Sequence, residues 1–161
     1  MRPEMLHKLQ SSVLPRHYRS DLSSKVPDGY LLFRKGAYVS LVMPFSDVPE
    51  GDFGSKTAKS LIRSILTCVP FFMEKGLFLI YYGDEQSWGD VAGKFTVDKT
   101  ALRPVILQSI HFIDPNTGKN VNSRTHWGPL KFGFCGKLID DIESMAESIQ
   151  QGAQPDAYGA G

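Results

Sequence analysis

Cysteine is scarce in this chain, and the spacings that disulfide or zinc chemistry requires are missing. The two cysteines, Cys68 and Cys135, are too few for a disulfide framework. The sequence contains no Cys-x-x-Cys, no His-Glu-x-x-His and no pair of histidines three or four residues apart. We therefore expect no metal site, no cofactor and two reduced, structural thiols, which is typical of an intracellular protein.

Long hydrophobic runs are also lacking. The longest apolar stretch is far shorter than the roughly 20 residues that a membrane-spanning helix needs. The N-terminus starts with basic residues, but no apolar segment followed by small residues comes after them, so we expect no signal peptide. These absences predict a cytoplasmic protein, or one that is associated with a virus particle.

The signatures of common catalytic classes are missing as well. The stretch Gly51–Thr57 is similar to a phosphate-binding loop, but Ser55 stands before Lys56, where that signature requires glycine. Neither a Gly-x-Ser-x-Gly elbow nor a dinucleotide-binding fingerprint occurs. We therefore assign no catalytic residue.

What the chain does have is one long amphipathic pattern. Apolar residues at i, i+3, i+4 and i+7 predict a helix that begins at Ser55, its expected N-cap, and ends at Gly76. Pro70 interrupts this pattern and predicts a kink or break near Val69. The predicted apolar stripe consists of Ala58, Leu61, Ile62, Ile65, Leu66, Val69, Phe72 and Met73.

Strand-like segments flank this helix. Tyr30–Arg34 and Ala37–Met43, joined by Lys35-Gly36, predict a tight hairpin. Leu77–Tyr82 is apolar without alternation, which predicts a strand covered on both faces. A turn is expected at Asp114–Gly118. Further strands are predicted at Lys94–Asp98, Val105–Ile113, Lys119–Thr125 and Leu130–Cys135.

The predicted fold class is α+β. Residues 1–151 form a single domain, in which a curved, mainly antiparallel sheet packs on the central, proline-kinked helix. Residues 1–26 supply a short N-terminal helix and a basic arm, Leu138–Gln150 a C-terminal helix, and residues 152–161 a flexible tail. An α/β sandwich with some parallel pairing is the alternative.

Charge and recognition-type side chains are unevenly distributed. The net charge is +1, yet residues 1–36 contain seven Lys and Arg against three acids, and residues 138–161 contain five acids and no base. Such segregation favours self-association or contact with an anionic partner, although it is also compatible with ordinary solvated faces. The predicted binding residues are Arg16, Tyr18, Arg19, Trp88, Arg124, His126 and Trp127.

These features predict a non-catalytic protein that binds another macromolecule or copies of itself. A viral or phage matrix- or coat-like component is our first expectation, with the basic arm on nucleic acid or an anionic membrane. In its order of elements the chain loosely resembles small matrix proteins of negative-strand RNA viruses. A small inhibitor or immunity-type protein that binds one partner is the second reading.

A small hydrolase is the third reading. Asp84 and Glu85 directly follow the predicted buried strand, where α/β proteins often place catalytic carboxylates. His111 would complete such a site. Trp88, in the same loop, is predicted to be either a lid over the core or an exposed anchor for a partner.

Overall fold

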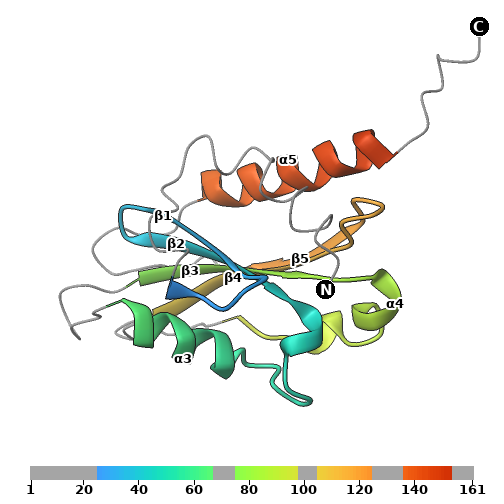
Figure 1. Cartoon of the computed structure of the whole chain (residues 1–161). Helices are drawn as coiled ribbons and strands as arrows, with labels where there is room; N and C mark the ends of the chain where they lie inside the picture. The colour runs from blue at the N-terminus through green and yellow to red at the C-terminus, as the bar shows by residue number, and fades with distance from the viewer. Residues whose placement is uncertain (1–24, 67–74, 98–104, 125–135, 154–161) are drawn as a thin grey trace, which may run out of the picture.

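In the computed structural model, residues 25–66, 75–97, 105–124 and 136–153 are described, and they form one open sheet with helices on both faces (Figure 1). The helix α3 covers one face and α5 covers the other. The elements in chain order are β1 (Leu31–Lys35), β2 (Tyr38–Pro44), η2 (Phe45–Asp47), α3 (Lys56–Ile65), β3 (Lys75–Tyr82), α4 (Glu85–Trp88), η3 (Ala92–Lys94), β4 (Val105–Ile113), β5 (Asn120–Arg124) and α5 (Gly136–Ala153).

The five strands lie side by side in the order in which they occur in the chain. The outer pairs, β1–β2 and β4–β5, are antiparallel, whereas β2–β3 and β3–β4 are parallel. Parallel neighbours need a crossover, which α3 provides before β3 and which α4 and η3 provide before β4. The prediction of a single α+β domain with a central helix on the sheet is confirmed, and the sheet itself is mixed.

Local sequence signals place most strands within one or two residues of their predicted bounds. The β1–β2 hairpin turns at Gly36, whose φ of 60° is one that glycine adopts without penalty. The strand β4 has its predicted range, and the following turn ends at Gly118, whose φ is 77°. The predicted strand at Lys94–Asp98 is wrong for its described part, because Lys94 ends the 3-10 helix Ala92–Lys94 and residues 95–97 belong to no strand.

Each face of the sheet has its own apolar core. In β3, Leu77 and Leu79 face α3 while Phe78 and Ile80 face α5. This confirms that the strand after the central helix is covered on both sides. Burying apolar surface is the main favourable contribution to folding, at about 25 cal/mol per Å². The helix α5 contributes Leu138, Ile139, Ile142, Met145, Ala146 and Ile149 to its core.

The helix α3 is shorter than predicted and is capped by another residue. Leu66 already has an extended backbone, so the helix ends before the predicted kink, and residues 67–74 lie outside the described part. Ser55 holds the N-cap position with a φ of 54°, but its hydroxyl accepts a hydrogen bond from Tyr81 at 2.9 Å. Asp52 instead accepts from the amides of Lys56, at 2.8 Å, and Thr57, at 3.1 Å.

The Asp52 cap is expected to contribute to the stability of the fold. Asp52→Ala removes both acceptors from the first turn of α3, so we expect a loss of about 1 kcal/mol in the free energy of unfolding. Urea unfolding monitored by circular dichroism measures it. The matched control is Glu50→Ala, an exposed acid in the same loop, which should change stability by less than about 0.5 kcal/mol. Equal losses in the two variants would contradict the cap.

Two further predictions need correction. Gly76 lies inside β3 and does not end a helix; a Cβ there would lie only 2.9 Å from the Tyr38 ring, so the position needs glycine for packing. The last helix begins at Gly136, before the predicted start, and continues through Gly152 to Ala153.

The predicted N-terminal helix, the strand at Leu130–Cys135 and the tail from residue 154 lie outside the described residues. Among the helices that are described, none combines the length and apolar character needed to cross a membrane.

Candidate functional site

The predicted binding residues fall into three groups. Arg124 is exposed at the end of β5, where a partner can reach it. Trp88 is only 1% exposed; its Nε1 donates to the Gly83 carbonyl at 2.8 Å, and its ring lies 5.8 Å from that of Phe112. Of the two predicted roles for Trp88, the structure shows the lid over the core and not the exposed anchor, so Trp88 offers no surface to a partner. Arg16, Tyr18, Arg19, His126 and Trp127 lie outside the described residues.

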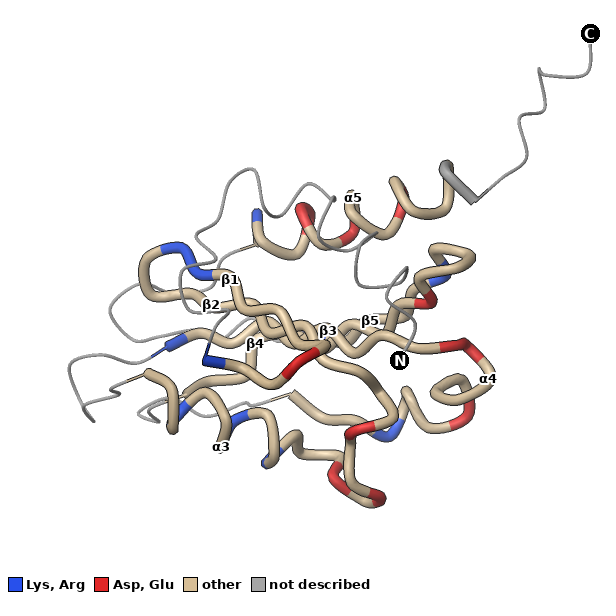
Figure 2. The backbone as a smooth tube through the Cα atoms, in the orientation of Figure 1, with Lys and Arg blue, Asp and Glu red and all other residues tan. Residues whose placement is uncertain are grey.

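The two helices that cover the sheet carry opposite charge. In α3, Lys56, Lys59 and Arg63 give +3, and the helix contains no acid. In α5, four acids stand against Lys137, which gives −3. Figure 2 shows these charges on opposite sides of the sheet. The acids of α5 are Asp140, Asp141, Glu143 and Glu147.

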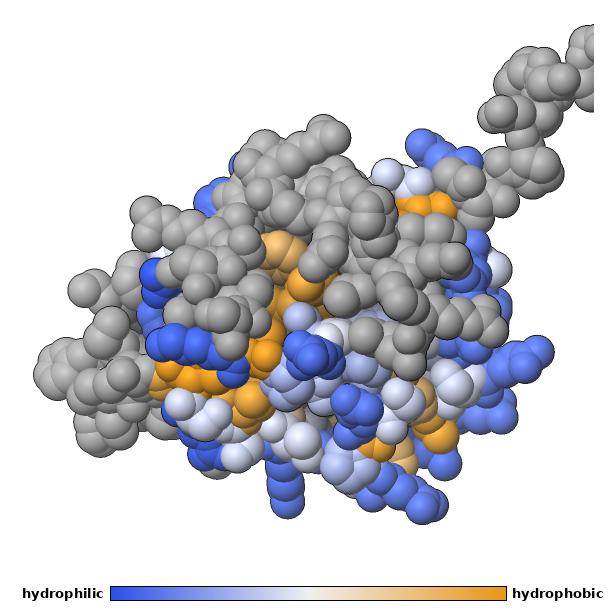
Figure 3. Space-filling model, viewed as in Figure 1, coloured by the Kyte–Doolittle hydropathy of each residue, from blue (hydrophilic) through white to orange (hydrophobic). Residues whose placement is uncertain are grey.

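A shallow groove follows the exposed side of α3. It is wide open to solvent, with a volume of about 400 Å³, and its described lining consists of Lys56, Thr57, Ser60, Leu61 and Ser64. In the space-filling view, hydrophobic surface lies beside hydrophilic side chains over this helix (Figure 3). The first amides of α3 already bond to Asp52, so they are not open to an anion. The charge that this surface presents is therefore that of its basic side chains.

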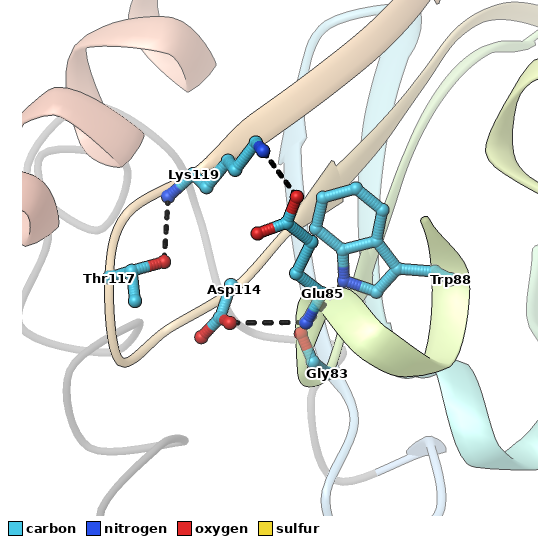
Figure 4. Close-up of polar contacts among 6 residues, drawn as sticks. All are labelled: Gly83, Glu85, Trp88, Asp114, Thr117 and Lys119. Carbon is cyan, nitrogen blue, oxygen red and sulfur yellow. Dashed lines mark hydrogen bonds and ion pairs between the residues drawn. The ribbon is translucent and has the colours of Figure 1, made fainter. Parts of the chain in front are cut away.

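The paired acids after β3, Asp84 and Glu85, contact the β4–β5 turn, and Figure 4 shows the contacts of Glu85. Asp84 is the N-cap residue of α4 and accepts a hydrogen bond from the Asn116 side chain at 3.3 Å. The Glu85 amide donates to the Asp114 carboxylate at 3.1 Å, and the Glu85 carboxylate pairs with Lys119. These contacts tie α4 to the β4–β5 turn, and the ammonium of Lys119 offsets the charge of Glu85.

Asp114 is the centre of this junction, whereas its sequence context predicted only a turn. Its second carboxylate oxygen accepts from the Asn116 amide at 2.8 Å, and its own amide donates to the Lys119 carbonyl at 2.9 Å. The Gly118 amide completes the turn by donating to the Asp114 carbonyl at 2.7 Å. Asp-Pro-Asn is a sequence in which the aspartate side chain bonds its own backbone two residues on, and this was the available signal.

His111 is enclosed in the core on the α5 face. Its Nε2 lies 2.9 Å from the Ser109 hydroxyl, and its Nδ1 has no hydrogen-bond partner among the described residues. Burial, together with a smaller contribution from the nearby charge of Arg124, lowers the pKa of His111 from 6.5 to about 3. The imidazole is neutral at pH 7 and closed to solvent, whereas Asp84 is exposed. The structure therefore does not bring His111 and the acids to one accessible cleft.

Family models, curated proteins and solved structures give no match to this chain. The candidate site therefore follows from the chain's own geometry, and we define it as the exposed sides of α3 and α5. Within the described ranges, no group of three or more His, Cys, Asp or Glu side chains is arranged to hold a metal ion.

Proposed function

We propose that this protein works by binding, as a self-assembling structural component of the matrix or coat type inside cells or virus particles. The observation that carries this proposal is the opposite charge of α3 and α5 on the two faces of one sheet. A molecule with a basic helix on one side and an acidic helix on the other is attracted to further copies of itself.

The loop contacts support the same proposal. Asp84 and Glu85 are engaged in joining α4 to the β4–β5 turn, and His111 is enclosed in the core. The hydrolase reading needs these three groups to converge on a substrate. Their present positions favour a structural role for each of them.

Self-assembly predicts that the molecular mass rises with protein concentration and falls with salt. Exposed ion pairs are worth about 0.2–1 kcal/mol each, so the contact is weak and concentration-dependent. Sedimentation velocity from micromolar to millimolar protein, in about 50 mM and about 500 mM salt, measures it, because the Debye length shortens several-fold over that range. A constant monomer mass at every concentration in low salt would refute self-assembly.

The same measurement separates the other binding readings. An added nucleic acid or anionic vesicle that binds with a steep salt dependence, while the protein alone stays monomeric, would indicate an anionic partner. The inhibitor reading instead predicts one tightly held protein partner. For that reading Arg124, exposed at the end of the edge strand β5, is the described residue to replace first.

A further inference from the structure

The exposed sides of α3 and α5 share one residue pattern with opposite charges. In α3 the pattern is base, serine, base, serine at positions i, i+4, i+7 and i+8; in α5 it is acid, serine, acid, serine at the same spacing. All eight side chains are exposed. The α3 stripe consists of Lys56, Ser60, Arg63 and Ser64, and the α5 stripe of Asp140, Ser144, Glu147 and Ser148.

This spacing places each stripe on a single side of its helix. Residues at i, i+4, i+7 and i+8 fall within a sector of about 100° around an α-helix, and seven residues span about 10.5 Å along its axis. The two charges of the α3 stripe are therefore as far apart as the two charges of the α5 stripe. Both charge pairs can be matched at once, whether the two helices run parallel or antiparallel.

The serines between the charges favour close contact of the two helices. Small side chains allow helix axes to approach, and hydroxyl groups can form hydrogen bonds across the contact. Ser64, whose hydroxyl donates to the Leu61 carbonyl at 2.7 Å, would accept such a bond. The groove along α3 is lined by Ser60 and Ser64 of the stripe and by Leu61, which offers apolar surface. A helix from another molecule can lie in such a groove with its charged residues against Lys56 and Arg63.

We infer that the α3 stripe of one copy binds the α5 stripe of the next copy. This inference rests on the proposed self-assembly and names its contact. The two stripes lie on opposite faces of the same sheet (Figure 1). Each copy therefore uses one face for the copy before it and the other for the copy after it. Such a heterologous contact forms an open stack, or a ring if the rotation closes, instead of a two-fold dimer.

Charge reversal of one stripe at a time tests this contact. Lys56→Glu with Arg63→Glu makes both helices acidic, and Asp140→Lys with Glu147→Lys makes both helices basic. We expect either doubly substituted protein alone to associate at least about tenfold more weakly than the unaltered chain. An equimolar mixture of the two should associate again, because each acidic face then meets a basic one.

Matched controls separate this contact from a general effect of net charge. Lys25→Glu with Lys94→Glu and Glu50→Lys with Asp90→Lys change the net charge by the same amounts at exposed positions outside both helices. These control proteins should keep association within about threefold of the original in low salt. Circular dichroism melting of every variant checks that the fold is retained.

The outcomes distinguish the stack from the broader proposal. Recovery of mass in the mixture supports the stack, and so does association of the variant in which all four charges are reversed. If the unaltered protein associates but the mixture remains monomeric, self-assembly stands and the stripe contact is wrong. If stripe variants and controls lose association equally, the contact is also wrong. If the unaltered protein is monomeric throughout, both proposals fail.

Discussion

Gly118→Ala is expected to lower the free energy of unfolding by about 2–5 kcal/mol. A left-handed backbone conformation costs a residue with a Cβ about 1–2 kcal/mol, and Gly118 has a φ of 77°. The added Cβ would also lie 2.6 Å from the Cα of Gln150 in α5, an overlap that adds about 1–3 kcal/mol. Urea unfolding of the purified variant measures the loss.

Gly36 provides a matched control for this substitution. It too has a left-handed backbone, with a φ of 60°, but a Cβ there would meet nothing within 4 Å. Gly36→Ala should therefore cost only about 1–2 kcal/mol. The difference between the two variants measures how closely the β4–β5 turn packs on α5. Identical losses would mean that the turn does not press against the helix.

Acidification from about pH 7 to about pH 5 is expected to remove about 2 kcal/mol of stability through His111. The fold lowers the pKa of His111 from 6.5 to about 3, so the folded state favours the neutral imidazole. For a group whose pKa is lowered on folding, the unfolded chain binds the proton first. The contribution is therefore complete above pH 6.5 and is lost as the pH falls toward 3.

Comparison with His111→Gln isolates this effect from other titrating groups. Glutamine keeps a hydrogen-bonding partner for the Ser109 hydroxyl but does not titrate. Two charged groups lie near His111, namely Arg124 of β5 and Glu143 of α5. Glu143 accepts a hydrogen bond from the side chain of Asn122, which is the residue opposite His111 in the sheet. Both remain in the variant. Urea unfolding at several pH values should give a flatter profile for His111→Gln, and parallel profiles would contradict the assignment.

Local sequence patterns predicted much of the fold. The glycine turns at Gly36 and Gly118 and the apolar run at Leu77–Tyr82 gave the strands and their two-sided burial, because these signals act over a few residues. Pairing between strands is different. No local pattern distinguishes β3 lying parallel to β2 from an antiparallel arrangement, since the crossover through α3 decides it.

The candidate site needed the structure for the same reason. The charged positions of both helices can be read in the sequence, but their matched spacing gains meaning only when α3 and α5 lie on opposite faces of one sheet. The roles of Trp88 and Gly76 also depend on distant neighbours. Trp88 packs on Phe112, and Gly76 faces the Tyr38 ring. The role of Ser55 also depends on a distant residue, because the Tyr81 hydroxyl donates a hydrogen bond to the Ser55 hydroxyl, which makes no bond to the first turn of α3.

The order of elements has a consequence for how the chain is made. During synthesis each strand from β1 to β5 can join the sheet beside its predecessor, because spatial order follows chain order. The face that holds Leu31, Phe33 and Val42 is covered by α5, the last described helix. Among the described residues, this face lacks its α5 cover until translation has passed residue 153. A chain released before Gly136 therefore lacks α5 and its cover of this apolar surface, and exposed apolar surfaces drive aggregation of nascent proteins.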